Sequence, residues 1–327
     1  MVNRTLTAGS VVITGGCGFL GAALARRINN DGITLPDGRS VMPQIHLWDR
    51  AGSAVPDLPN VRFKALDIAD AEAVNAAMPS DTVLVYHLAA VVSAQAEADF
   101  DLAMRVNLVG TRTVLEASRD LGRNVPLIGT SSLAVYGGRP AEPLTETTAI
   151  QPENTYGVTK AMAELLMADF RRRGWVDART LRLPTVMVRP GRPNAAASSF
   201  ASSIIREPLS GEAAICPVDP ALKMWITSPD AAVTALWHAP SVSAANWPAF
   251  GAVNVPGLQV AVSDMISALR KRAGDETADL VSIQRDERIA GIVESWPSLF
   301  DTAVAQSLGF IGDSSFDAIM DQALRMK

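Results

Sequence analysis

The sequence predicts an α/β protein built on a doubly wound, parallel sheet, with a smaller, loop-rich C-terminal lobe. Apolar runs with the length of strands alternate with helical patterns through the first 184 residues. A glycine-rich turn joins the first run to the first helix, and the second run ends in an acidic residue. Strands that alternate with helices favour right-handed crossovers and therefore a parallel sheet.

The expected elements follow one another in the order that this fold requires. β-branched and alternating apolar residues predict strands over 11–13, 44–49, 61–67, 82–88, 125–129, 180–183 and 252–255. Helical patterns predict helices over 22–28, 71–78, 100–121, 155–173 and 262–272, with short helical pieces near Ala303 and Ile319. The segment 252–255 is expected to rejoin the sheet after a long stretch of chain that lies outside it.

The stretch outside the sheet begins at Pro184, where the regular alternation of strands and helices ends. Repeated prolines punctuate the chain from there to Lys223, a pattern typical of a loop-rich lobe. We therefore expect the sheet domain to comprise 1–184 with a returning segment near 230–260, and the lobe to comprise 185–229 and 261–327.

Composition argues against several classes of protein. Of the 327 residues, 48% are hydrophobic and 19% are charged, which indicates a large buried core. The net charge of −5, without a sustained basic run, argues against nucleic acid and anionic membranes as partners. Cys17 and Cys216 stand alone and the histidines are dispersed, so we expect neither a disulfide nor a metal site. Without a signal-peptide pattern or a membrane-length apolar run, the sequence predicts a cytoplasmic protein.

A glycine-rich turn, 14–21, follows the first predicted strand and opens the first helix. In this context Gly15 permits a tight turn, Gly18 lets the backbone approach a pyrophosphate, and Gly21 lets helix and strand pack closely. Phe19 and Leu20 begin the helix, whose first N–H groups favour an anion. The spacing is Gly-x-x-Gly-x-x-Gly, and a merely flexible turn is the alternative.

Asp49 ends the second predicted strand, at the position of the acid that binds the adenosine ribose hydroxyls of NAD. The same carboxylate repels the 2′-phosphate of NADP, so a Rossmann sheet that binds NAD is expected. Arg50 is a complication, because an arginine there can bind that phosphate. A turn-capping role for Asp49 is the other alternative.

Three further residues are candidates for an acid–base catalytic site. Tyr156 and Lys160 are four apart on a predicted helix and therefore share a face. A phenol has a pKa of about 10 in water, and a neighbouring ammonium, with oxidised nicotinamide, lowers it toward the range of a useful base. Ser132, near the end of the preceding strand, is placed to bond the same substrate oxygen. A chance Tyr–Lys spacing is the alternative for that pair taken alone.

Taken together and in order, these motifs resemble the extended short-chain dehydrogenase/reductases, which include nucleotide-sugar epimerases and dehydratases. The resemblance runs from about Val11 to the C-terminus and is carried by the motifs at 14–21, 67–68, 87–90, 131–137 and 156–160. It implies NAD as cofactor and Ser132, Tyr156 and Lys160 as the catalytic set. It also implies cofactor-side positions for Asp67, Ile68, Leu88, Ala89, Ala90, Asn107 and Pro184.

The segment after the sixth predicted strand departs from the sugar-nucleotide members of this family. Those members usually carry Arg-x-x-Asn and a later Arg-Asp-aromatic segment on the nucleotide diphosphate. This chain has Thr185 in place of the asparagine and Lys223 in place of the later arginine. Segments 188–200 and 204–209 instead resemble the D-erythronate dehydrogenase group, which oxidises a four-carbon sugar acid at C2.

A small hydroxy acid needs a cation for its carboxylate and hydroxyl groups for its diol. Arg189, Ser198 and Ser199 are candidates, with Ser93 facing the same pocket, and a solvated loop is the alternative for Arg189 and Arg192. We expect Tyr156 to take the C2 hydroxyl proton while the C2 hydride passes to the nicotinamide and Ser132 steadies the developing ketone.

Two rival functions remain open at this point. An epimerase or dehydratase would hold NAD tightly, act on a nucleotide sugar and release no NADH. A dinucleotide sensor without activity would commonly lack Tyr156 or Lys160. The family resemblance also implies a homodimer, formed through the helices that contain 103–117 and 161–170.

Overall fold

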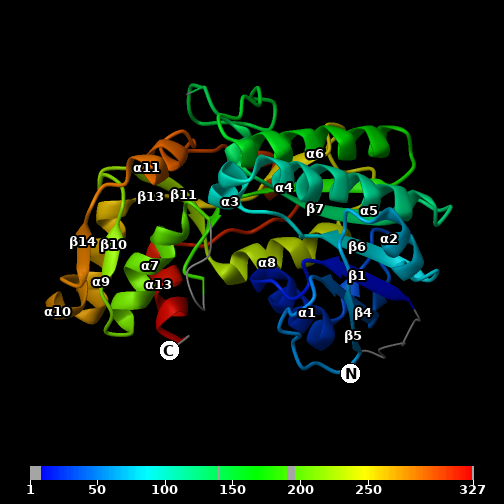
Figure 1. Ribbon diagram of the computed structural model, residues 1–327, viewed down its shortest axis with the longest axis horizontal. Helices are drawn as coiled ribbons and strands as arrows, with labels where there is room; N and C mark the ends of the chain where they lie inside the picture. The colour runs from blue at the N-terminus through cyan, green and yellow to red at the C-terminus, as the bar shows by residue number, and fades with distance from the viewer. Residues whose placement is uncertain (1–8, 139, 190–195, 326–327) are drawn as a thin grey trace.

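The computed structural model describes residues 9–138, 140–189 and 196–325, and within them a parallel sheet of seven strands forms the centre of the molecule (Figure 1). The strand order is β12-β8-β7-β6-β1-β4-β5. The bounds are β1 Ser10–Thr14, β4 Gln44–Asp49, β5 Val61–Ala65, β6 Thr82–His87, β7 Pro126–Ser132, β8 Asp177–Leu183 and β12 Ala252–Asn254. The order reverses on either side of β1, which confirms the doubly wound sheet.

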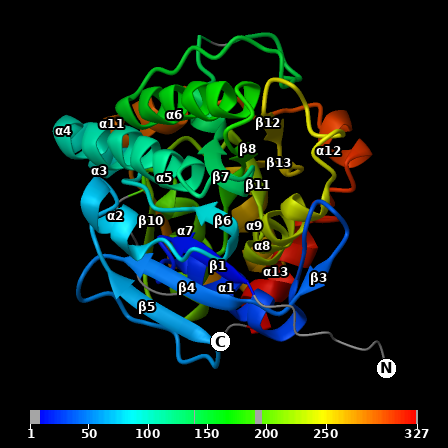
Figure 2. The ribbon, with the colours of Figure 1, turned by 90° about the vertical axis from the view of Figure 1, so that its right-hand side faces the viewer.

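Alternation along the central strand assigns the two faces of the sheet. Val11 and Ile13 pack with helices α1 (Phe19–Asp31) and α8 (Pro229–His238), whereas Val12 packs on the opposite face. Helices α2 (Ala71–Ala77), α5 (Gly110–Arg119) and α6 (Thr155–Arg172) cover that second face (Figure 2). Both faces of β1 are buried, which explains its uninterrupted β-branched sequence.

The predicted helix over 100–121 is interrupted by π-helical backbone. It consists of α4 (Phe100–Ala103), a π-helical segment (Met104–Val109) and α5. A π-bulge accommodates an extra residue and is common beside functional sites. Asn107 lies inside this segment and is buried.

A second hydrophobic core lies beside the sheet. It is built from α7 (Ser199–Leu209), α9 (Val262–Ala273), α11 (Glu287–Val293) and α13 (Phe316–Arg325). Helices α9 and α13 were expected, whereas the sequence analysis had not predicted α7 and α11. Also present are α10 (Asp275–Ala278) and, in the described residues, the small sheets β13-β11-β9 and β10-β14. Their strands are β9 Thr185–Val186, β10 Ala214–Cys216, β11 Lys223–Thr227, β13 Leu258–Ala261 and β14 Val281–Ile283.

The C-terminal half returns to the main sheet twice. β12 pairs with β8 in parallel, which confirms that 252–255 rejoins the sheet. Ala305, in α12 (Ala303–Ser307), and Phe310 pack in the sheet core beside Trp247. The remaining short elements are β2 Ile33–Thr34, β3 Ser40–Val41, α3 Ser93–Ala98 and the 3₁₀ turns Leu133–Val135 and Ala239–Ser241. In the described part of the chain, no helix combines the length and apolar character needed to cross a membrane.

Candidate active site

A pocket opens at the carboxyl ends of the central strands, where ligands bind in doubly wound sheets. It extends from the glycine turn, past the end of β7 and the start of α6, to the segment after β8. Its lining includes Gly15, Gly18, Phe19, Leu20, Gly21, Leu88, Ala90, Ser93, Ser132, Tyr156, Lys160, Pro184, Arg189 and Ser198. Most of the site residues predicted from the sequence therefore lie together.

The glycine turn fits a dinucleotide phosphate. Gly15 has a φ of +65°, and a Cβ there would lie 2.8 Å from the backbone nitrogen of Ala89. Among the described residues, no side chain caps the start of α1 at Gly18, and its first turn carries no acidic residue. The free N–H groups and positive end of the helix thus face the pocket without an internal competitor.

Asp49 is held beside this turn by three donors. Its carboxylate accepts hydrogen bonds from the backbone N–H of Cys17 at 3.0 Å, the N–H of Arg50 at 2.8 Å and the Ser53 hydroxyl at 3.1 Å. These bonds fix the acid at the end of β4, next to the glycines. This geometry suits the binding of a ribose diol. Asp49 therefore caps the turn and, at the same time, is held in a position where it could bind a ligand.

Asp67 and Ile68, which the family resemblance places on the cofactor side, lie outside the pocket lining. Asp67 forms an ion pair with Arg105 and accepts a hydrogen bond from the Ala69 N–H at 3.0 Å. Ile68 is buried and packs where a side chain at Gly110 would otherwise sit. Both residues therefore help to hold the loop after β5 against the π-helical segment and α5.

Asn107 has a structural connection to the active site. Its side chain accepts a hydrogen bond from the Val91 N–H at 2.7 Å and donates to the Val91 carbonyl at 3.1 Å and to the Thr159 hydroxyl at 3.0 Å. Thr159 in turn donates to the carbonyl of Tyr156 at 2.9 Å. Asn107 thus ties the loop after β6 to the helix that carries Tyr156 and Lys160.

A second hydrogen-bond chain, which the sequence had not revealed, fixes the same loop. The Thr111 hydroxyl donates to the Asn107 carbonyl at 2.6 Å, so it accepts from Nε2 of His87 at 2.9 Å. Nδ1 of His87 therefore accepts from the Thr14 hydroxyl at 2.8 Å, which accepts from the Ala89 N–H at 3.2 Å. Burial, with Lys160 nearby, lowers the pKa of His87 to about 3, which keeps this chain neutral.

Ser132, Tyr156 and Lys160 meet at the centre of the pocket. Burial raises the pKa of Tyr156 to about 12, while a hydrogen bond with the Ser132 side chain and the charge of Arg189 lower it. Nζ of Lys160 lies 6.0 Å from the centre of the tyrosine ring. Burial lowers the pKa of Lys160 to about 8, against the opposing effect of Glu164. The sequence had pointed to Lys160 as the protein's cation acting on the phenol, whereas in the structure the charge that lowers this pKa is that of Arg189.

Arg189 reaches the pocket from a segment that α7 holds by its backbone. The Arg189 N–H donates to the Ser202 hydroxyl at 3.1 Å, and its carbonyl accepts from Arg206 at 2.7 Å. Burial and the charge of Arg206 lower the pKa of Arg189. A guanidinium withdrawn from water beside a second cation is stabilised by an anion, so this position suits a carboxylate.

The predicted serines have different surroundings. Ser198 lines the pocket, and Ser93 also lines it while its hydroxyl accepts the Ala197 N–H at 2.8 Å. Ser199 lines a neighbouring groove between α3, α7 and α11 instead. Arg192 belongs to the segment 190–195, which lies outside the described residues.

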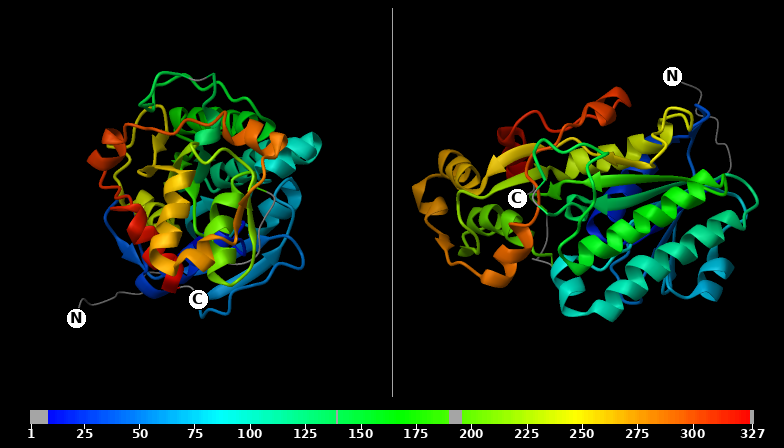
Figure 3. Two further views of the ribbon diagram at one scale, coloured as in Figure 1. Left: turned by 90° about the vertical axis from the view of Figure 1, so that its left-hand side faces the viewer. Right: turned by 90° about the horizontal axis from the view of Figure 1, so that it is seen from above.

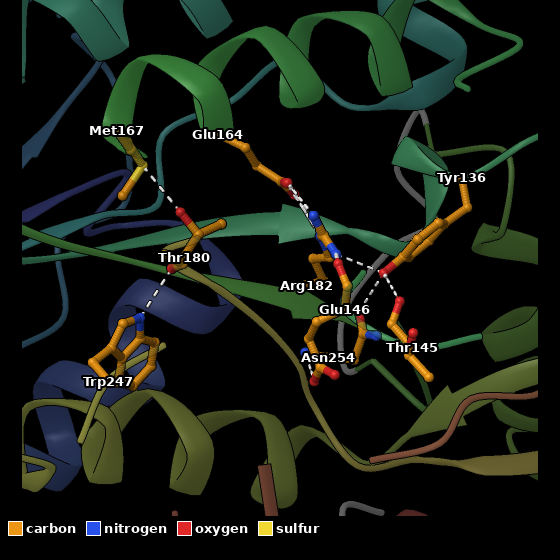
Figure 4. A network of polar contacts seen from close by, with 10 residues as sticks. Tyr136, Thr145, Glu146, Glu164, Met167, Thr180, Arg182, Trp247 and Asn254 are labelled. Carbon is orange, nitrogen blue, oxygen red and sulfur yellow. Dashed lines mark hydrogen bonds and ion pairs between the residues drawn. The ribbon is translucent and has the colours of Figure 1, made fainter. Parts of the chain in front are cut away.

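Arg182, the arginine of the Arg-x-x-Asn position, turns away from the pocket into a buried polar network (Figure 4). It binds the carboxylate of Glu164 at 2.7 Å and donates to the phenol oxygen of Tyr136 at 2.6 Å. Tyr136 also donates to Asn254 at 2.9 Å, and the Asn254 N–H donates to Glu146 at 3.0 Å. These bonds join α6, β8, β12 and the loop after β7, so Arg182 is a structural residue here.

This fold and this site define an enzyme of the extended short-chain dehydrogenase/reductase type. The chain belongs to the NAD dependent epimerase/dehydratase family, whose model matches residues 11–239. It is 48% identical to a D-erythronate dehydrogenase of Cupriavidus necator over 312 residues, which cover 95% of this chain and 96% of that protein. It is 40% identical to a D-erythronate dehydrogenase of Haemophilus influenzae over 316 residues, covering 95% and 98%.

Solved structures share the whole architecture. A structure described as the nucleoside-diphosphate-sugar epimerase from Agrobacterium tumefaciens superposes with a TM-score of 0.90 at 34% identity, covering 99% of this chain and 96% of that one. L-threonine 3-dehydrogenase from Trypanosoma brucei has a TM-score of 0.84 at 23% identity, covering 96% and 95%. The second likeness shows the fold alone.

Proposed function

We propose that this enzyme oxidises a small sugar acid at C2 with NAD, and that the acid is D-erythronate, which gives 2-dehydro-D-erythronate. The observation that carries the proposal is Arg189, a half-buried cation in the same pocket as Tyr156. A carboxylate bound there places the adjacent C2 hydroxyl within reach of the phenol. The identity to two D-erythronate dehydrogenases over most of the chain supports the same substrate.

Six residues of the pocket have a role in this scheme. Arg189 binds the carboxylate, and Tyr156, as phenolate, removes the proton of the C2 hydroxyl. Ser132 bonds the same oxygen as it becomes a ketone, and Lys160 binds the nicotinamide ribose. Ser93 and Ser198 line the region left for the remaining hydroxyls. Bound NAD supplies the hydride acceptor and a positive charge beside the phenol.

A nucleotide-sugar substrate fits these residues less well, although one similar structure is described as an epimerase. Arg182 is engaged with Glu164 and does not line the pocket. Lys223 is exposed at the start of β11, also outside the lining, and Thr185 lines the pocket in place of an asparagine amide. The groups that would hold a diphosphate are therefore replaced or occupied elsewhere.

Absorbance of NADH separates the two functions. With NAD and D-erythronate, the protein should produce NADH in proportion to the acid consumed. With a panel of nucleotide sugars it should produce none and should leave the sugar unchanged. Epimerisation or dehydration of a nucleotide sugar, without turnover of any four- to six-carbon aldonate, would contradict the proposal.

We expect a strong preference for NAD over NADP because Asp49 is held in place by three donors. An Asp49→Ser variant should lose about 10- to 100-fold in kcat/KM with NAD, the range for a lost charged hydrogen bond. The ratio of kcat/KM with NAD to kcat/KM with NADP should therefore fall as well. Asp37→Ser, which removes an exposed carboxylate from the β2–β3 turn, is the matched control and should change neither value. Equal efficiency of the wild type with both cofactors would count against the assigned role.

We also propose a homodimer formed through α6 and the helix that contains α4 and α5, which lie side by side (Figure 3). Exposed apolar side chains gather on this pair of helices: Phe100, Val109, Val158, Met162 and Leu165. Leu165 is 64% exposed. Leu165→Arg should therefore convert a dimer to a monomer in light scattering, whereas Ile311→Arg, at an exposed residue outside these helices, should not. A wild type that stays monomeric at high concentration would refute the dimer.

A further inference from the structure

Arg206, on α7, contacts the backbone of Arg189 and is not among the site residues expected from the sequence. Its guanidinium donates to the Arg189 carbonyl at 2.7 Å and, through its other terminal nitrogen, to the Glu207 carboxylate at 2.5 Å. The side chains of Arg206 and Glu207 are only 18% and 15% exposed. A charged hydrogen bond that is largely shielded from water is stronger than one at the surface, so this contact restrains Arg189.

Two side chains of α7 together hold the backbone of Arg189. The Ser202 hydroxyl accepts the Arg189 N–H at 3.1 Å, and Arg206 binds the carbonyl of the same residue. Ser202 and Arg206 are four apart on α7 and therefore share one face of the helix. This face thus binds both backbone polar groups of Arg189, while the side chain of Arg189 lines the pocket.

The support behind these two contacts is packed into the core of the smaller lobe. Ile204 and Ile205 of α7 are fully buried there, and Met187 packs in the same core. The Met187 N–H also donates to the Thr227 carbonyl at 2.9 Å. The chain therefore reaches Arg189 from a fixed, close-packed segment, and the helix that holds Arg189 cannot shift at low cost.

The charge of Arg206 is unfavourable beside Arg189 in the protein alone. Burial and then the charge of Arg206 lower the pKa of Arg189, which means that both disfavour the charged guanidinium at this position. An uncharged side chain could bond the same carbonyl without that repulsion. A bound carboxylate offsets the repulsion between the two cations, so the arrangement fits a site whose ligand is an anion.

We propose that Arg206 is the positioning residue of the carboxylate site: it holds the Arg189 backbone so that the Arg189 side chain binds the carboxylate of the substrate. The inference rests on the proposed function and extends it. It predicts that Arg206 matters for the charged end of the substrate, and only while Arg189 is present.

Replacing Arg206 and Glu207 together, as Arg206→Gln with Glu207→Gln, removes the contact without changing the net charge or leaving a buried charge unpaired. The ligands are the 2-deoxy analogue of D-erythronate, which has no C2 hydroxyl to oxidise, and its uncharged amide. Calorimetry with saturating NAD measures both Kd values without turnover. This pair variant should raise the Kd of the acid about tenfold, near the lower end for a lost hydrogen bond to a charged group, and leave that of the amide within about twofold.

A double-mutant cycle separates positioning from a general loss of structure. Arg189→Met should raise the Kd of the acid by about 10- to 100-fold, and adding the pair variant to it should cost less than about twofold more, since Arg206 acts through Arg189. Arg206→Lys keeps the charge beside Glu207 but loses the planar fork that makes both bonds. It should raise the Kd of the acid by about twofold to fivefold, and it provides a second variant that leaves Glu207 paired.

The ion pair of Arg272 and Asp321 offers a matched control in the same lobe, outside the pocket lining. Arg272→Gln with Asp321→Asn should leave the Kd of acid and amide unchanged, and thermal unfolding with the Kd for NADH establishes that each variant is folded. If the wild type oxidises D-erythronate and prefers the acid to the amide, an unchanged preference in the variants at Arg206 would overturn this inference alone. A wild type that oxidises no sugar acid would overturn the proposed function with it.

Discussion

Replacing Tyr156 with Phe should lower kcat by about 10²- to 10⁴-fold, the usual contribution of a positioned acid–base group. The change removes one oxygen and leaves the ring, so the pocket keeps its shape. The Kd for NADH should stay within about twofold, because the glycine turn, Asp49 and Lys160 remain. Stopped-flow kinetics and NADH fluorescence measure the two quantities on the same protein.

Tyr86→Phe is a matched control for this variant. Its phenol is buried and donates to the Leu236 carbonyl at 3.2 Å, outside the pocket lining. The control should therefore leave kcat unchanged and cost about 1 kcal/mol in the free energy of unfolding, the worth of one hydrogen bond. Substantial turnover by Tyr156→Phe would refute the assignment of the base.

The role of Tyr156 as base also predicts how kcat/KM changes with pH. With a pKa of about 12 in the protein alone, the Tyr156 phenol is almost wholly protonated at neutral pH. A base acts in its deprotonated form, so kcat/KM should rise with pH until the phenol is ionised in the complex. The charge of Arg189 lowers this pKa, so Arg189→Met should move the rise to higher pH as well as weaken substrate binding. A profile that falls with pH over the same range would be inconsistent with a tyrosine base.

Breaking the buried pair of Arg182 and Glu164 should destabilise the protein by about 3–5 kcal/mol. Both side chains are 6% exposed, and the carboxylate receives the guanidinium at 2.7 Å. Arg182→Met would leave Glu164 charged and without its cation inside the protein. Replacing both, as Arg182→Met with Glu164→Leu, should recover most of the loss because neither charge of the pair is then left buried without the other.

Chemical denaturation measures these changes in the free energy of unfolding. The exposed pair of Arg112 and Glu116 offers a matched control, since the arginine there is 66% exposed. Arg112→Met should change the free energy by less than about 1 kcal/mol. If Arg182→Met and Arg112→Met had the same small effect, the network in Figure 4 would not be a source of stability.

Local patterns predicted the sheet and pointed to the candidate catalytic residues because both depend on nearby sequence. The β-branched residues of β1 and the spacing of Tyr156 and Lys160 on one helix are visible within a few positions. The whole of β8 was harder to predict. Asp177 and Arg179 resemble surface residues, so the expected strand began only at Thr180, yet all seven residues of β8 are buried.

Pairing over long distances accounts for that difference. Arg179 bonds to Asp177 and to the carbonyls of Ala239 and Val242, which lie 60 and 63 residues away in the sequence. Likewise α7 was not predicted, because the prolines around it suggested loops, although Pro208 falls only in its last turn. Trp296, which also lines the pocket, becomes part of that lining only when the lobe folds against the loop after β7.

Isotope transfer tests the central claim most directly. D-erythronate carrying deuterium at C2 is oxidised with unlabelled NAD, and the NADH formed is analysed by mass spectrometry. The proposed arrangement of Arg189 and Tyr156 predicts one deuterium in the NADH for each molecule of acid consumed, together with a ketone at C2. Unlabelled NADH, or deuterium that remains in the acid, would contradict it.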